Sequence, residues 1–333
     1  LTRSDDSLRW HENTDGHGTF ASPSVILTET LHDVVVGDMN DDGQIDIVVS
    51  SGGGLHWYHK HSDGASFLPE VMAAGANHGR IATADMDGDG DLDVMTDDSW
   101  WFENDGAGHF SQQTMGLTNL PRQWAFVDLD DDGDADLLTS KPNADVIWHE
   151  NVDGRGNFGT ARIVARNGAR FGGVNLQPAD IDGDGDLDIV SASYTADLSW
   201  HENTAFGPKH LIERYHGADS ALYAADLDGD DDLDLVTSTR YAEPSSLGWL
   251  ENTDGQGNFG PRAEILSLDS ELTASINDMD GDGQLDIVVA GCDTMMWYEQ
   301  RTLGDANDDG QFDSQDLVRV FVAGTYEDNV EDN

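Results

Sequence analysis

A nine-residue acidic loop occurs six times in this chain, at intervals of 43 to 52 residues. Each copy has Asp or Asn at positions 1, 3 and 5 and Asp at position 9, and five of the six have Gly at position 6. A repeat period of this length is typical of propeller blades. The sequence therefore predicts an array of similar units. The copies begin at Asp38, Asp85, Asp128, Asp180, Asp226 and Asp278.

This pattern of oxygen donors is suited to calcium. Carboxylates at alternate positions, a backbone carbonyl at position 7 and a carboxylate at position 9 can surround one Ca²⁺, and Gly at position 6 permits a sharp turn. The fifth copy has Asp231 at position 6, where a left-handed backbone is costly for Asp. Asp-Gly clusters also form ordinary turns, but a turn does not need acids at five alternate positions.

We therefore expect six calcium sites in the repeats. Position 7 contributes its carbonyl oxygen in each. The predicted ligand residues are Asp38, Asn40, Asp42, Gln44 and Asp46; Asp85, Asp87, Asp89, Asp91 and Asp93; Asp128, Asp130, Asp132, Asp134 and Asp136; Asp180, Asp182, Asp184, Asp186 and Asp188; Asp226, Asp228, Asp230, Asp232 and Asp234; and Asp278, Asp280, Asp282, Gln284 and Asp286.

The net charge of -50 follows largely from these loops, which together with residues 305–316 hold more than half of the 66 acidic residues. Without metal the loops should repel one another. No basic stripe exists that could neutralise phosphates, so nucleic acid is disfavoured as a partner. Only three lysines are present, and a halophilic protein stays an open alternative.

The calcium sites favour a location outside the cell or at its surface, because extracellular calcium is abundant enough to fill them, whereas cytosolic calcium usually is not. The single Cys292 excludes an internal disulfide framework, so calcium would take over the cross-linking role. No run of 18 apolar residues is present, and we expect no membrane span. The chain begins without Met or a signal peptide, and we expect that processing or excerpting removed the true start.

Each repeat contains signals for four short strands, which is the content of a propeller blade. Apolar runs precede and follow each loop and indicate strands that are buried on both faces. A third strand carries Trp, and a Gly-containing turn leads to a fourth. The Trp positions number seven: Trp10, Trp57, Trp101, Trp148, Trp200, Trp249 and Trp297.

Residues 1–10 resemble residues 138–148, which follow a loop directly. Leu1 is therefore predicted to lie in the second strand of a blade whose first strand and loop lie upstream. We expect an all-β, seven-bladed propeller of four-stranded blades, with six blades as the alternative. Its last blade would be closed by a strand from upstream sequence or from a neighbouring chain, because an open sheet edge invites pairing.

The repeats resemble the FG-GAP/VCBS family, which occurs in integrin alpha-chain heads and many bacterial surface proteins. The resemblance rests on the loops and covers residues 1–302. It implies a propeller with calcium in the hairpins between the first two strands of each blade. It does not imply one activity, since this fold carries adhesion modules, lectins and some lyases.

Residues 303–333 are predicted to form a second region. Counted from Asp305, the twelfth residue is Asp316, and apolar residues then follow at helical spacing. This segment is similar to a dockerin-type half repeat, with an EF-hand-like loop before a helix. It would add a seventh calcium site, with the ligands Asp305, Asn307, Asp309, Asp313 and Asp316.

A binding module is expected rather than an enzyme. His11, His149 and His201 precede Glu and could act as acid-base pairs, but other repeats carry Tyr, Phe or Leu at this position, which indicates a packing position. The repeated Trp residues are assigned to the core rather than to sugar stacking.

Residues outside the repeat pattern are the candidates for a partner surface. The expected partner is a protein or a glycan at the cell surface. Self-assembly into a homo-oligomer or filament by strand donation is a further expectation, and a lectin, or less favourably a polysaccharide lyase, is the alternative. The residues that stand out are Trp100, Arg122, Trp124, 162–171 and 240–246.

Overall fold

The structure is a computed structural model of the 333-residue chain. The dockerin-like segment and the proposed ligands Asp280, Asp282 and Gln284 lie outside the described residues. The structure describes residues 1–298 except 5–6, 15–19, 62–65, 76–77, 118–119, 122, 141–144, 167–173, 194–196, 204–207, 215–221, 240–244, 269–272, 280–284 and 291–294.

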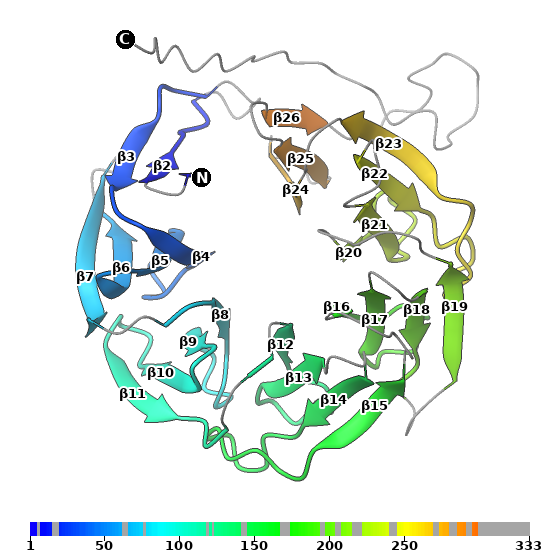
Figure 1. Ribbon diagram of the computed structural model, residues 1–333, viewed down its shortest axis with the longest axis horizontal. Helices are drawn as coiled ribbons and strands as arrows, with labels where there is room; N and C mark the ends of the chain where they lie inside the picture. Colours follow the sequence, from blue (N-terminus) through cyan, green and yellow to red (C-terminus); the bar gives the residue numbers. More distant parts are fainter. Residues whose placement is uncertain are drawn as a thin grey trace. The chain divides into compact units, whose positions relative to one another are not determined.

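The described part of the chain is all-β, and every regular element in it is a strand. Five sheets have four strands that pair antiparallel in chain order (Figure 1). These sheets are β4 (Leu31–Gly37), β5 (Asp46–Ser51), β6 (Gly54–Lys60), β7 (Phe67–Ala74); β8 (Ile81–Ala84), β9 (Asp93–Thr96), β10 (Trp100–Asn104), β11 (Phe110–Thr114); β12 (Trp124–Val127), β13 (Asp136–Ser140), β14 (Asp145–His149), β15 (Arg162–Arg166); β16 (Val174–Ala179), β17 (Asp188–Ser193), β18 (Leu198–His201), β19 (Lys209–Glu213); and β20 (Leu222–Ala225), β21 (Asp234–Thr239), β22 (Ser245–Leu250), β23 (Ala263–Leu268).

Two further sheets have three strands each. One contains β1 (Thr2–Ser4), β2 (Ser7–Trp10) and β3 (Ser24–Leu27), and the other contains β24 (Thr273–Asn277), β25 (Asp286–Ala290) and β26 (Met295–Tyr298). The first follows the pattern of strands two to four of a blade, as predicted for Leu1, and the second that of strands one to three. The predicted count of seven blades is therefore corrected to six, the alternative count, because these two sheets are each one strand short of a blade.

The chain forms two compact units. Unit 1 contains β1 to β15, and unit 2 contains β16 to β26 together with Asn13 and Phe20. Within a unit the first strands of successive sheets contact one another, β4 with β8, β8 with β12, and β16 with β20. This is the arrangement of blades in a β-propeller.

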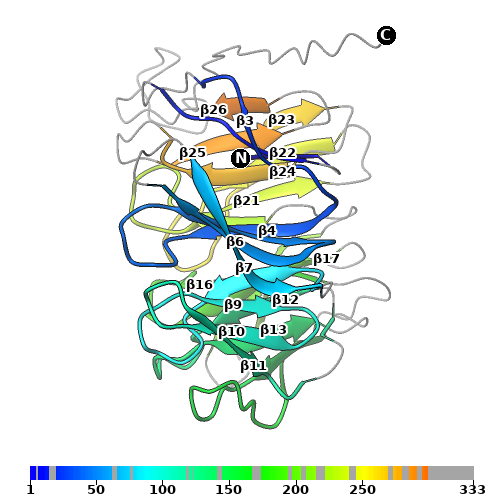
Figure 2. The same cartoon turned by 90° about the vertical axis from the view of Figure 1, so that its left-hand side faces the viewer.

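Burial changes systematically across a blade. The second strand is fully buried, as β5 and β13 show, whereas the fourth strand is largely exposed, as in β11. Figure 2 shows β9, β10 and β11 in this order. The first strand was expected to be buried on both faces, but β4 is mostly half-buried. The reason is that a first strand has a paired neighbour within its sheet on one side only.

The hydrophobic core lies between successive blades. Trp57 of β6 packs in one cluster with Val94 and Phe102 of the next blade. Trp249 of β22 packs in the same way with Ile287 and Val289. Trp57, Trp101, Trp200 and Trp249 are all buried, so their assignment to the core is confirmed. The repeated Trp joins blades to one another and thereby fixes the position of the loops at their ends.

Candidate metal centres

Each acidic loop joins the first and second strands of a blade, as the family resemblance implied. The Asp at position 1 closes the loop on itself by accepting hydrogen bonds from backbone N–H groups. In the second loop, Asp85 Oδ1 accepts from Asp89 N at 3.1 Å and Oδ2 accepts from Gly90 N at 2.9 Å. Asp38, Asp128, Asp180 and Asp226 likewise accept from the N–H of position 6. These hydrogen bonds form the turn without the help of an ion.

Two positions of the loop have a left-handed backbone. Position 6 was predicted, and Asp231 does have a φ of 73°, as Gly has elsewhere. Position 4 was missed: Asp41 has a φ of 53°, Asp131 of 59° and Gly88 of 72°. The signal was present in the sequence, because position 4 is Asp or Gly in every copy. These two turns bring the side chains of alternate positions to one side.

The Asp at position 9 is buried and links the loop to the third strand. Asp93 accepts hydrogen bonds from Met86 N at 3.0 Å and from Asn104 N at 2.7 Å. The equivalent pairs of bonds occur in the other four loops that are described throughout. Burial raises the pKa of Asp93 to about 7, although these two bonds oppose the shift. Burial likewise raises the pKa of Asp188 to about 7.

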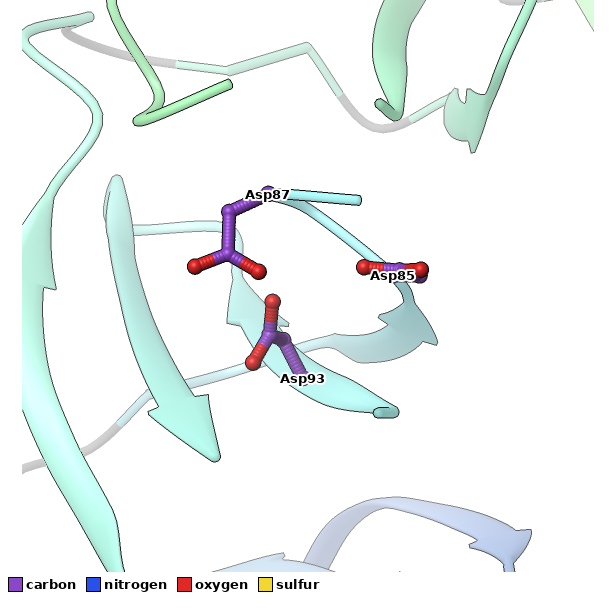
Figure 3. A group of neighbouring side chains, drawn as sticks. All are labelled: Asp85, Asp87 and Asp93. Atoms are coloured by element: carbon purple, nitrogen blue, oxygen red, sulfur yellow. The ribbon is translucent and has the colours of Figure 1, made fainter. Parts of the chain in front are cut away.

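The loop carboxylates converge. Figure 3 shows the carboxylates of Asp87 and Asp93 facing one another, with Asp85 beside them, and one oxygen from each lies within 4.8 Å of the others. The third, fourth and fifth loops contain comparable groups, formed by Asp128, Asp130 and Asp132; Asp180, Asp182 and Asp188; and Asp226, Asp228 and Asp230.

The donors fit a hard cation. Oδ1 of Asp87, Asp182 and Asp228 is buried and has no hydrogen-bond partner. A buried, unpaired carboxylate oxygen is costly, and a Ca²⁺ ion removes that cost by accepting oxygen ligands at roughly 2.3–2.6 Å. Burial and neighbouring negative charges also disfavour the ionised form of these carboxylates. Burial, and then the charges of Asp234 and Asp230, raise the pKa of Asp228 to about 7.

The copies are not equivalent. In the first loop Asn40 occupies position 3, and its side chain accepts a hydrogen bond from Asp42 N at 3.2 Å. This loop does not bring three acidic oxygens together within the described residues. In the sixth loop only Asp278 and Asp286 of the proposed ligands are described. Its Met279 N donates to Asp286 at 2.8 Å, as in the other copies.

One acidic residue near the loops was missed as a ligand candidate. Glu202 follows the third strand, and one of its oxygens lies within 4.8 Å of oxygens of Asp182 and Asp184. The signal was the repeated Trp-x-Glu, whose Glu had been considered only as the partner of the neighbouring His in an acid-base pair. Position 7 was expected to act through its carbonyl alone. In the third loop the side chain of Asp134 also has a buried oxygen without a partner.

The His positions behave as packing positions. His201 is buried, and burial lowers its pKa to about 4, so its ring is neutral at physiological pH. The equivalent residues Tyr58, Phe102 and Leu250 belong to core clusters. The side chain at this place in the third strand therefore packs inward in these four blades, whereas His11 and His149 are half-buried.

The residues proposed for a partner surface have different environments. Trp100 is 38% exposed, whereas Trp124 is buried and packs edge-on against Phe126. Arg162 forms an ion pair with Glu150 and lies over the ring of Trp148. Ser245 and Ser246 are buried. The rest of this set, Arg122, 167–171 and 240–244, lies outside the described residues.

The described part of the chain holds no helix with the length and hydrophobicity needed to cross a lipid bilayer.

Comparison with protein families gives one match. The model described as FG-GAP-like repeat matches residues 38–96, 128–191 and 180–237, which together make up about half of the chain. All three matches start at the Asp in position 1 of a loop. A comparison with curated proteins finds no match.

Several solved structures share the fold. A lectin from Agrocybe aegerita, solved to explain recognition of non-reducing terminal N-acetylglucosamine, is 19% identical over 78% of this chain and 80% of its own, with a TM-score of 0.58. The BP39L lectin from Burkholderia pseudomallei is 15% identical over 86% and 87%, with a TM-score of 0.61. BBS1N, solved in complex with ARL6DN, is 12% identical over 82% and 78%, with a TM-score of 0.51.

Proposed function

This chain belongs to the family of FG-GAP-like repeat proteins, and on that basis we propose that it is a calcium-stabilised binding module that acts outside the cell or at its surface. We assign the propeller to residues 1–302 and a dockerin-like half repeat to residues 303–333. The function rests on the ion sites, which would be rigid supports for the blades. The partner would be a protein or a glycan.

The observation that carries the proposal is the set of buried carboxylate oxygens without partners at position 3 of three loops. Calcium would supply the positive charge that these oxygens need, and the acids at positions 1, 3, 5 and 9 would hold it. Extracellular calcium modules bind with dissociation constants of about 10⁻⁴ to 10⁻³ M. Extracellular calcium can fill such sites, and this supports a location outside the cell.

Calcium titration of the full chain tests the proposal. We expect several bound ions and a large drop in the melting temperature when a chelator is added. Asp184→Asn should remove one site, whereas Glu264→Gln, at an exposed position outside the loops, should remove none. Binding of little or no calcium by the folded wild-type chain would refute the proposal.

Carbohydrate is the ligand class to test first. The support is the shared fold with two lectins. Four of the repeated Trp residues, Trp57, Trp101, Trp200 and Trp249, are buried and are not available for stacking on a sugar. A glycan would therefore use other side chains, such as the exposed Trp100. A glycan array in calcium tests this idea. Binding without turnover would favour a lectin, and release of unsaturated sugars would favour a lyase.

Self-assembly by strand donation is a further proposal about partners. Its support is that the sheets β1–β3 and β24–β26 have three described strands each, since an open sheet edge can accept a strand by main-chain hydrogen bonding. Light scattering in calcium should then give a mass above that of one chain. A mass of one chain at all concentrations would exclude this form of binding.

A further inference from the structure

We propose that the glutamate two residues after the third-strand Trp is a calcium ligand, which reaches the ion from outside the nine-residue loop. This inference rests on the proposed calcium sites and names a residue that their loop motif does not contain. Beside the second to fifth loops these glutamates are Glu103, Glu150, Glu202 and Glu251.

The geometry is clearest at Glu202. One of its oxygens groups with oxygens of Asp182 and Asp184, all within 4.8 Å of one another. Two ligands on opposite sides of a calcium ion, each about 2.4 Å from it, are about 4.8 Å apart. Asp182 also groups with Asp180 and Asp188. Asp182 is thus common to both groups, and we infer that Glu202 and the loop acids hold one ion.

Strand pairing explains why this glutamate reaches the loop. In β17 the position 9 residue Asp188 precedes Ile189, and Ile189 pairs with His201 of β18. Glu202 is the next residue and therefore lies level with the end of the loop. The bond from Asn203 N to Asp188 Oδ1, 3.0 Å long, holds the chain there. The pairing of β17 with β18 therefore holds the position 9 Asp and the glutamate side by side.

The same pairing occurs in three other blades. Leu235 pairs with Leu250, Leu137 with His149, and Val94 with Phe102. The residue after each third-strand partner is a glutamate, as it is in β18. The structure therefore places a carboxylate from the end of the third strand beside four loops by one rule.

The electrostatics of the loop acids at position 3 indicates that these glutamates lie near them. Glu103 is one of the charges that raise the pKa of Asp87, after burial and Asp89. Glu150 does the same for Asp130 and Glu251 for Asp228. Like charges at this distance repel unless a cation lies between them.

Two of these glutamates have additional contacts through Oε2. Glu103 accepts hydrogen bonds from Ser111 and Gln113, and Glu150 pairs with Arg162 at 2.6 Å. Such contacts can orient a ligand, but they could also be the whole reason for the residue. Glu202 is therefore the residue on which the inference is best tested.

The first loop departs from the rule at both places. Its position 3 is Asn40, and the residue two after Trp57 is His59. His59 lies 3.8 Å from Glu70 and close to the ring of Trp57. The first loop therefore lacks both the carboxylate at position 3 and the carboxylate after the third strand. Their joint absence is expected if the two carboxylates bind one ion. This loop should therefore bind calcium more weakly than the others.

The main test compares Glu202→Gln, Asp184→Asn and Glu264→Gln in the full chain. Calcium binding is followed by isothermal titration, and terbium luminescence serves as a second probe. We expect Glu202→Gln to weaken one site roughly tenfold, because affinity follows the number of charged ligands, and to leave the other sites unchanged. Glu264→Gln should behave as wild type.

A second readout separates a ligand from a structural residue. Glu202→Gln should raise the melting temperature in chelator, because it removes a repulsion, and lower it in calcium. A glutamate that only stabilises the fold would lower it in both. As a gain of function, Asn40→Asp combined with His59→Glu should tighten the first site by a similar factor.

The outcomes are distinguishable. If Asp184→Asn loses a site and Glu202→Gln binds as wild type, the inference is wrong and the calcium module stands. If the folded wild-type chain binds no calcium, the proposed function fails, and the inference with it. If Glu202→Gln does not fold, the test passes to Glu251→Gln and to the first-loop variant, and unchanged affinities in both would overturn the inference.

Discussion

The side chain of Asn252 donates a hydrogen bond from Nδ2 to the backbone carbonyl of Ile181, 71 residues earlier, at 3.0 Å. Ile181 is position 2 of the fourth loop, and Asn252 follows the third strand of the next blade. Asn151 makes the same bond to Met86 and Asn104 to Met39, each at 2.8 Å. Each of these loops is therefore held from outside by the blade that follows it.

The two residues Asn13 and Met279 repeat this relationship within unit 2. Asn13 Nδ2 donates to the carbonyl of Met279 at 2.9 Å, across 266 residues of sequence. Met279 is position 2 of the sixth loop. Residues from the two ends of the described chain thus form the same bond that connects successive blades elsewhere.

Removal of this contact should cost stability. Asn252 is buried, and Asn252→Ala would leave the carbonyl of Ile181 and the N–H of Gly257 without their partner. We expect a loss of about 1–3 kcal/mol in the free energy of unfolding, measured by urea denaturation in saturating calcium. The exposed Asn258→Ala is the control, and an equal loss there would argue against a special role for Asn252.

Replacement of Asp231 should stabilise the protein. Its left-handed backbone is strained for Asp, and Gly at this position would relieve about 1 kcal/mol. Asp231→Gly should therefore raise the melting temperature both in calcium and in chelator. The reverse change in the fourth loop, Gly185→Asp, should lower it. A lower melting temperature of Asp231→Gly would show that the Asp side chain has a favourable contact that outweighs the strain.

Gly257 should not tolerate a side chain. A Cβ atom there would lie 2.5 Å from the ring of Trp200, and the φ of 73° adds strain. Gly257→Ala should cost about 3 kcal/mol. Gly116→Ala is the matched control, because Gly116 has a φ of 65° but open space around it, and it should cost about 1 kcal/mol. Similar losses in both would mean that contact with Trp200 is unimportant.

Stability should depend on pH with opposite signs in chelator and in calcium. In the metal-free folded state burial raises the pKa of Asp93 and Asp188 to about 7, far above their ordinary value of 3.8. The folded state then binds more protons than the unfolded state between about pH 4 and pH 7, so stability falls as the pH rises through this window. In chelator the melting temperature should increase from pH 8 to pH 5.

In calcium the ion favours the charged carboxylates, and protons compete with it. The melting temperature should therefore decrease from pH 8 to pH 5. Scanning calorimetry at several pH values, with and without calcium, measures both slopes. Equal slopes under the two conditions would show that the ion does not bind at these carboxylates.

The acidic loops were predictable because their chemistry is local. The donor at position 1 binds N–H groups four and five residues later, and the turn residues follow it directly. The left-handed backbone at position 6 was predicted from Gly, and that at position 4 could have been. The repeat period and the Trp positions likewise predicted the strands of each blade. These features depend on residues within a few positions of one another.

The blade count and the role of Glu202 were not predictable in the same way. Repeated signals show how many units a sequence contains, but a strand belongs to a blade only if a neighbour pairs with it. The predicted count of seven blades was therefore wrong, and the alternative of six holds for the described residues. Glu202 lies 18 residues beyond Asp184, and only the register between β17 and β18 brings it to the loop.

The array of repeats, the turn chemistry and the loop acids follow directly from the sequence, because short-range hydrogen bonds and backbone preferences specify each loop. Which strand carries an additional carboxylate to a loop, and which Asn holds that loop from the next blade, depends instead on tertiary contacts. Those contacts join residues up to 266 positions apart. They form only when hydrophobic packing, with Trp at its centre, brings the blades together.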